Sequence, residues 1–86
     1  MKKIIIKEID EYVMDVKEVT FIYNDLKFVY RHNSSPSYTE SILIDLNSDE
    51  KKLTNIDLDN LKNYLEENYE ILDFESGDEF EIESIQ

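Results

Sequence analysis

The chain has 86 residues and a formal net charge of −12, because 21 aspartates and glutamates stand against nine lysines and arginines. It contains no cysteine, which excludes disulfide bonds, thiolate catalysis and cysteine-ligated zinc. The acidity excludes the basic stripe that a nucleic-acid-binding protein needs, and it equally argues against anionic membranes as partners.

Length and composition predict one folded domain that spans residues 1–86. A chain of this length buries only about 60% of its unfolded surface, so its core is small. Ten aromatic residues (six Tyr, four Phe) and many β-branched residues favour a folded chain over a disordered one. The first apolar run ends at Ile6, and no run approaches the roughly 18 residues of a membrane span. We therefore expect a soluble, cytoplasmic protein.

Residues 2–9 are rich in β-branched side chains and predict a strand. Residues 10–17 leave two alternatives, an extension of this strand or a bend. The clearest element is a hairpin whose strands, Val19–Tyr23 and Leu26–Tyr30, flank the dipeptide Asn24-Asp25. Both residues of that dipeptide tolerate the positive φ angles of a tight two-residue turn.

The register of this hairpin agrees with its hydrophobic pattern. A two-residue turn sets apolar residues opposite one another on a single face: Tyr23 with Leu26, Phe21 with Phe28, and Val19 with Tyr30. The same register opposes Glu18 and Arg31, a favourable pair of charges. This agreement predicts a half-buried antiparallel sheet.

The next segments predict a loop, a strand and another loop. His32–Ser37 is polar and contains a proline, so it predicts a loop. Tyr38–Leu46 predicts a strand, and Asn47–Thr54 predicts a connecting loop. The apolar residues of this strand that share one face, which we expect to point into the core, are Ile42, Ile44 and Leu46.

One helix is predicted over Asp57–Tyr69. Its apolar residues recur at helical spacing and form one stripe: Leu58, Leu61, Leu65 and Tyr69. We expect Asp57 to cap the N-terminus of this helix. We expect Asn68 to adopt the left-handed conformation that ends it.

Two further strands are predicted, Ile71–Glu75 and Glu79–Ile85, joined by a three-residue loop at Ser76–Asp78. That loop length pairs Phe74 with Phe80 and stacks acidic residues against one another on the other face. The alternative is that the helix continues through Leu72 and leaves a single terminal strand. The predicted fold is an α+β domain, with element order β-β-β-β-α-β-β and one helix packed across a small antiparallel sheet.

Most of the charge lies in the last part of the chain. From Leu53 onward there are eleven carboxylates and one lysine, so this third carries −10 of the total −12. We expect its strands and the helix end to present one anionic face without internal counter-charge. A solvated face that only raises solubility is the alternative. The predicted partner-binding residues are Glu66, Glu67, Glu70, Asp73, Glu75, Asp78, Glu79, Glu81 and Glu83.

No pattern indicates an enzyme, a cofactor or a metal site. The lone histidine, His32, lies in the predicted polar loop without a recognisable nucleophile and base. Asp73–Glu79 offers oxygen ligands suited to calcium, but its glycine falls one position too early for an EF-hand loop. We expect neither a catalytic residue nor a cofactor.

Carboxylates on one face of a strand recur about every 6.6–6.8 Å, a spacing similar to that of consecutive phosphates along a nucleic-acid strand. In size and charge the chain resembles the small acidic inhibitors of phages and mobile elements, which include anti-CRISPR and anti-restriction proteins. This resemblance implies a non-enzymatic inhibitor that mimics nucleic acid and blocks the basic groove of a nuclease or another nucleic-acid-binding effector. Its partner would be a basic protein surface, neither nucleic acid nor a membrane. The alternative is a generic protein–protein interaction or assembly module that uses a sheet edge.

Overall fold

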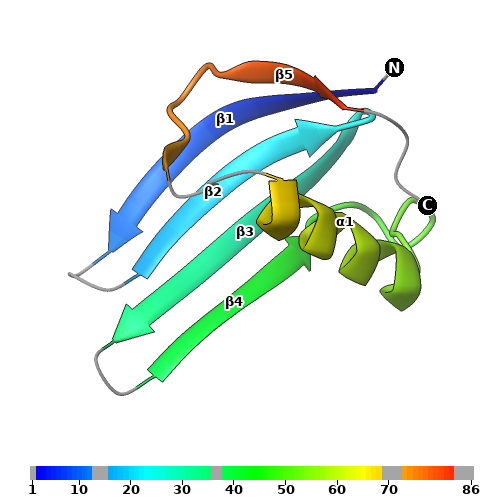
Figure 1. The fold of residues 1–86 in the computed structure, drawn as a ribbon. Coiled ribbons are helices and arrows are strands. Elements are labelled where there is room, and N and C mark those ends of the chain that lie inside the picture. Colours follow the sequence, from blue (N-terminus) through cyan, green and yellow to red (C-terminus); the bar gives the residue numbers. More distant parts are fainter. Residues whose placement is uncertain (1, 13–15, 36–37, 69–72, 83–86) are drawn as a thin grey trace.

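The computed structural model describes residues 2–12, 16–35, 38–68 and 73–82. Their elements, in chain order, are β1 Lys2–Tyr12, β2 Val16–Tyr23, β3 Leu26–Ser35, β4 Tyr38–Asp45, α1 Asn55–Asn68 and β5 Glu79–Ile82. The strands form one five-stranded antiparallel sheet in the order β4-β3-β2-β1-β5, and α1 packs across one of its faces (Figure 1). The predicted α+β arrangement is confirmed.

The central hairpin of β2 and β3 is confirmed in every predicted cross-strand pair. Asn24 (φ 53°) and Asp25 (φ 64°) both adopt the left-handed conformation of the turn. The rings of Phe21 and Phe28 stack with their centroids 5.6 Å apart. On the opposite face of the sheet, Arg31 donates a hydrogen bond from Nε to the Glu18 carboxylate over 2.6 Å.

The core lies between the sheet and α1. Full burial of an aliphatic or aromatic side chain contributes about 1.5–3 kcal/mol, so this small set supplies most of the stability. Its buried members are Ile4, Ile6, Val19, Phe21, Tyr23, Phe28, Tyr30, Leu43, Leu61 and Leu65. The two helical leucines lie one turn apart on the predicted apolar stripe.

A bulge in β1 sets which of its side chains reach this core. The pairing with β2 shifts between Ile6 and Glu8, which leaves Lys7 as the extra residue. Without the bulge, strict alternation after Ile4 and Ile6 would turn Glu8 toward the core. With it, Ile9 packs against the core and Glu8 is exposed.

Strand β4 presents the opposite face from the one predicted. Tyr30 is paired with Leu43, and Leu43 is the buried residue. Ile42 and Ile44 therefore lie on the face away from α1, and Leu46 is 49% exposed. The prediction chose the more hydrophobic of two alternating sets, whereas the register with β3 decides which set turns inward. The loop predicted from His32 is also wrong for residues 32–35, because β3 continues through them.

The helix begins earlier than predicted and has different caps. Thr54 is the N-cap, because its hydroxyl accepts a hydrogen bond from the N–H of Asp57 (3.1 Å), and Asp57 lies within the first turn. Asn68 is the last helical residue and does not adopt a positive φ. Its side chain instead donates to the carbonyl of Tyr64 over 2.9 Å. The helix is not long and apolar enough to span a membrane, nor is any other helix among the described residues.

The predicted terminal hairpin is wrong over the described residues. Residues 73–75 form no strand, and β5 pairs with β1 instead. The predicted pairing would have set Glu75 against Glu79, whereas the observed register sets Glu81 opposite Lys3. Opposite charges across the ladder therefore replace like charges. Tyr69, the strand start at 71–72, the alternative helix extension through Leu72 and residues 83–85 lie outside the described residues.

The loop between β4 and α1 is ordered by Asp45. Its carboxylate accepts hydrogen bonds from the backbone N–H groups of Asn47 and Leu53, each over 2.9 Å. Burial opposes ionisation, but these hydrogen bonds outweigh it and hold the pKa of Asp45 below its ordinary value of 3.8.

Asp45→Asn, which imitates the protonated carboxyl, should lower the free energy of unfolding at neutral pH by about 1 kcal/mol. Because the folded pKa lies below 3.8, the stabilisation by the carboxylate is present above 3.8 and is lost as the pH falls through the folded pKa. Urea denaturation of both proteins at neutral pH and at about pH 2–4 measures this. The two stabilities should converge in acid, and a constant difference at every pH would contradict the assignment.

Candidate partner-binding surface

The described members of the predicted acidic set are all exposed, but they lie on three different parts of the chain. Glu66 and Glu67 lie near the end of α1. Asp73, Glu75 and Asp78 lie on the connection from α1 to β5, and Glu79 and Glu81 lie on β5 itself. The remaining two, Glu70 and Glu83, lie outside the described residues.

The connection before β5 is fixed to β1 by backbone hydrogen bonds. The N–H of Gly77 donates to the carbonyl of Ile6 (2.9 Å), and the N–H of Ile6 donates to the carbonyl of Asp78 (2.8 Å). Gly77 has a φ of 92°, a conformation that glycine adopts without strain. Asp78 also accepts a hydrogen bond from the N–H of Glu75 over 2.8 Å. One carboxylate of the predicted site thus stabilises the turn that presents the others.

Strand β5 carries its carboxylates on the face away from α1. Glu79 is opposite Ile5 and Glu81 is opposite Lys3, so both lie on the side opposite the buried Ile4. Lys3 Nζ lies 3.5 Å from Glu79 Oε1. The expectation that the acidic face has no internal counter-charge is therefore wrong, because a lysine of β1 lies between two of its carboxylates. The pair is half exposed, so it contributes little to stability.

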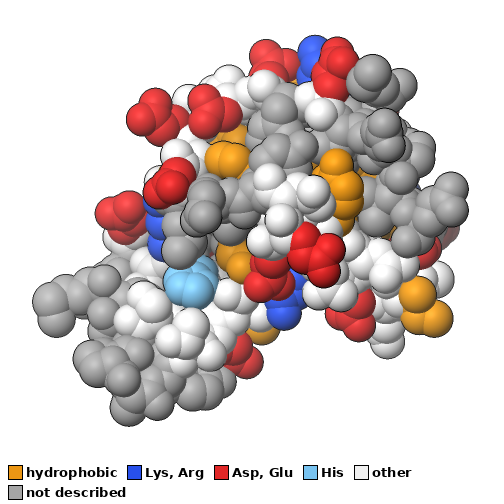
Figure 2. Space-filling view, in the orientation of Figure 1, with side chains coloured by type: hydrophobic (Ala, Val, Ile, Leu, Met, Phe, Trp, Pro, Cys, Tyr) orange, Lys and Arg blue, Asp and Glu red, His pale blue; other side chains and the backbone are white. Residues whose placement is uncertain are grey.

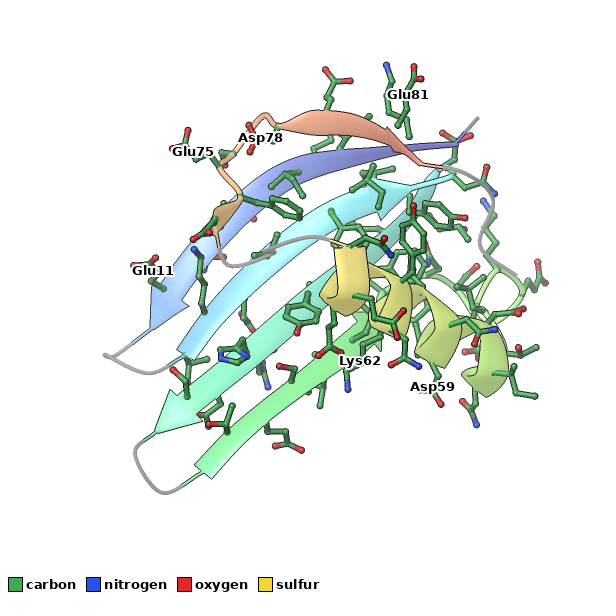
Figure 3. The ribbon with its side chains drawn as sticks, viewed as in Figure 1. Glu11, Asp59, Lys62, Glu75, Asp78 and Glu81 are labelled. Carbon is green, nitrogen blue, oxygen red and sulfur yellow. The ribbon has the colours of Figure 1, made fainter. Side chains whose placement is uncertain are left out.

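The acidic surface continues along β1, a strand of the near-neutral part of the sequence. β5 covers β1 only near its start, and three exposed carboxylates follow the bulge. Glu8 and Asp10 lie on the same face as Glu79, and Glu11 points to the other face. We call this combined edge the acidic rim; it consists of Glu8, Asp10, Glu11, Glu75, Asp78, Glu79 and Glu81. Figure 3 shows Glu11, Glu75, Asp78 and Glu81 spread along this side of the sheet.

The acidic residues of α1 form a separate group. In Figure 3 the helix and its labelled residues lie apart from the rim, and Figure 2 shows carboxylates both at the edge and over the helix. Glu66 is hydrogen-bonded to the hydroxyl of Tyr30 and lies 3.9 Å from Lys62 Nζ. Glu66 therefore links α1 to the sheet. The predicted single face is in fact a rim on one edge and a second group over the sheet.

A polar row crosses the helix-facing side of the sheet. Glu11, Lys17, His32 and Ser41 are successive cross-strand partners on β1, β2, β3 and β4. Lys17 Nζ lies 3.7 Å from Glu11 Oε1, and His32 Nδ1 lies 2.7 Å from Ser41 Oγ. His32 is half-buried in a strand, so its predicted place in a surface loop is wrong. Its partner Ser41 lies on the next strand, and the register of β3 with β4 brings the two side chains together.

The polar side chains of this row bond to one another. A serine nucleophile needs oxyanion donors beside its base. Here the Ser41 hydroxyl bonds both His32 and Tyr30, and within the described residues every buried side-chain nitrogen and oxygen has a partner. Over the same residues no group of three or more carboxylate or imidazole side chains is placed to hold a metal ion.

Comparison of the chain with models of protein families, with curated proteins and with solved structures finds no match.

Tyr30→Phe should lower the free energy of unfolding at neutral pH by about 1 kcal/mol, because the hydroxyl loses its bonds to Glu66 and Ser41. Burial raises the pKa of Tyr30 above 10.0. The negative charge of Glu66 and its hydrogen bond raise this pKa further, and the hydrogen bond to Ser41 lowers it. A raised folded pKa stabilises the fold below 10.0, and this contribution is lost as the pH rises through the folded value. Urea denaturation from neutral pH to about pH 11 should therefore show the two proteins converging in alkali.

A matched variant, Glu66→Gln, tests the cause of this shift. Removing the negative charge should move the pKa of Tyr30 down toward 10.0, which is read from tyrosinate absorbance as the difference from a Tyr30→Phe titration. An unchanged pKa would contradict the contact between α1 and β3.

Proposed function

We propose that this chain is a non-enzymatic inhibitor that mimics nucleic acid and occupies the basic groove of a nucleic-acid-binding effector, such as a nuclease that defends a cell against phages or mobile elements. The observation that carries the proposal is the acidic rim. Its carboxylates are exposed, lie along one edge of the sheet, and are held on two strands and on a turn that is hydrogen-bonded to β1.

The geometry of the rim suits a partner that binds phosphates. Glu79 and Glu81 lie on one face of β5, so their backbone positions are about 6.6–6.8 Å apart. The turn at Gly77, bonded to Ile6, continues the rim from β5 toward the carboxylates of β1. The longest dimension of the molecule is 36 Å. That dimension is close to the length of one turn of duplex DNA, about 34–36 Å.

The electrostatics favour association with a cationic surface. Carboxylates gathered on one edge repel one another, and Lys3, Lys7 and Lys17 neutralise the rim only in part. A groove lined with lysine and arginine relieves this repulsion and attracts the rim over a Debye length, about 8 Å at physiological salt. The same charge repels nucleic acid and anionic membranes. The proposed partner is thus a basic protein, and the proposed location is the cytoplasm.

We predict that the chain competes with nucleic acid for the groove and catalyses no reaction. The inhibitor would bind stoichiometrically, need no cofactor or metal, and exclude nucleic acid from the groove. Complementary charges mainly raise the association rate and set specificity, so binding should weaken steeply with salt.

Neutralising the rim should weaken inhibition. Glu79→Gln/Glu81→Gln removes two charges from β5 and should reduce inhibition of a basic-groove nuclease about tenfold. The assay measures DNA cleavage by a panel of RNA-guided and restriction nucleases, with increasing duplex DNA as competitor. The salt range runs from about 0.05 to about 0.3 M. Inhibition by the wild-type chain should fall as DNA or salt increases.

The control is Glu50→Gln/Asp59→Asn, which removes the same charge from exposed residues outside the rim. It should inhibit nearly as well as the wild-type chain, because the rim stays intact although the loss of total charge equals that of Glu79→Gln/Glu81→Gln. Equal losses of inhibition in the two variants would show that net charge, and not the rim, causes the inhibition. Inhibition that neither DNA nor salt opposes would reject nucleic-acid mimicry.

A further inference from the structure

The outer edge of β4 has backbone hydrogen-bonding groups that face no described part of the chain. The N–H of Leu46 donates to the carbonyl of Lys27 on β3 over 3.1 Å. In an antiparallel pair, successive residues alternate between facing their partner strand and facing away. The even-numbered residues of β4 therefore bond to β3. The residues whose N–H and C=O groups point outward are Thr39, Ser41, Leu43 and Asp45. In Figure 1 no described element lies beyond β4.

This edge lacks the features that normally prevent strand association. Natural edge strands are short, bulged, interrupted by proline or lined with charge. β5 at the other edge is four residues long and carries exposed Glu79 and Glu81. β4 is eight residues long, contains no proline, and keeps an unbroken register with β3. Of its two charged residues, Asp45 is engaged by the backbone of the following loop, and Glu40 is exposed near the start of the strand.

The side chains of β4 are self-complementary in one antiparallel register. With a two-fold axis at Leu43, the outward-facing backbone groups of the two copies bond to each other. Leu43 pairs with Leu43, and Ser41 pairs with Asp45. Ile42 then lies opposite Ile44 of the other copy, on the face away from α1. These would be non-hydrogen-bonded pairs, in which opposed side chains approach most closely. Shifting the axis to Ile42 would oppose Glu40 to Ile44 inside the strand. With the axis at Leu43, Glu40 lies opposite Leu46, one residue beyond the end of β4.

The charge distribution permits a second copy at this edge. β3 and β4 carry Lys27, Arg31, Glu40 and Asp45, which sum to zero with His32 neutral. β4 and β5 are the two ends of the sheet, so joining two copies at β4 puts their acidic rims at opposite ends. With strands about 4.8 Å apart, the rims would be several Debye lengths from each other.

We propose that two copies of this chain associate through their β4 strands, antiparallel about a two-fold axis at Leu43, to form one continuous sheet. The inference goes beyond the proposed inhibitor function and does not depend on it. The rims remain exposed in the dimer, one at each end.

Sedimentation of the wild-type chain at increasing concentration, up to about 1 mM, should show a monomer–dimer equilibrium. Raising the salt from about 0.05 to about 0.5 M should strengthen the dimer, because it screens the repulsion between two copies of charge −12. Binding of the rim to a basic groove should weaken over the same range, so failure of one proposal is distinguishable from failure of the other. A chain that stays monomeric at every concentration and salt level overturns the dimer.

A pair of charge variants tests the register. Ile42→Lys/Ile44→Lys and Ile42→Glu/Ile44→Glu should each sediment as monomers, because like charges would oppose across the axis. Mixed in equal amounts, they should form a heterodimer, since each lysine then opposes a glutamate. Circular dichroism of each variant alone checks that it is folded. Folded variants that still dimerise alone, or that fail to pair when mixed, overturn this register.

Ile22→Lys is the control for another mode of association. Ile22 lies on the same face as Ile42 but in β2, inside the sheet. Edge pairing predicts that this variant still dimerises. Loss of its dimer, with the edge variants still dimeric, would indicate face-to-face stacking and overturn pairing through β4.

Discussion

The pairing of β1 with two neighbours is the interaction on which the rest of the structure depends. β1 pairs with β2 on one side and with β5 on the other, so the first strand joins the near-neutral part of the chain to the acidic part. Ile4 and Ile6, fully buried beside Phe21, anchor it in the core. The bulge at Lys7 then keeps Ile9 inward and Glu8 outward. The acidic rim exists because these constraints are met together: apolar residues hold β1 in the sheet, and its edge carries the carboxylates.

An element could be predicted from the sequence when the strands it pairs with lie close to it along the chain. The β2–β3 hairpin could be predicted because its turn, register and hydrophobic pattern all lie within one short segment, from Glu18 to Arg31. The inward face of β4 could not, because Leu43 and Ile42 are both apolar and the choice depends on alignment with Tyr30. The partner of β5 was harder still, since β1 lies at the other end of the chain. A local hairpin also satisfies the apolar pattern, but it opposes Glu75 to Glu79, whereas pairing with β1 sets Glu81 opposite Lys3.

Only part of the candidate site could be predicted from the sequence. A charge count along the chain indicates an acidic C-terminal third, and its described carboxylates are exposed. The count missed Glu8, Asp10 and Glu11, because the lysines of the same segment average them to neutrality in sequence. In the fold Lys17 pairs with Glu11, whereas all three carboxylates stay exposed along β1. It also gave Glu66 the same role as Glu79, although Glu66 bonds the buried Tyr30 across the core. Composition reports how much charge is present, whereas strand register decides which charges share a surface.

The two edges of the sheet differ in charge, and they therefore differ in the partners that they can accept. At β5, carboxylates surround a short strand, and such charges are a general means of preventing another strand from adding to an edge. The rim therefore protects the edge on which it lies, whether or not a partner binds it. A cationic groove is not hindered by this protection, because it contacts side-chain charge and needs no backbone hydrogen bond. At β4 the backbone groups of Leu43 face outward with little charge around them, so that edge selects a strand. Charge on one edge and its absence on the other thus separate the kinds of partner that each can accept.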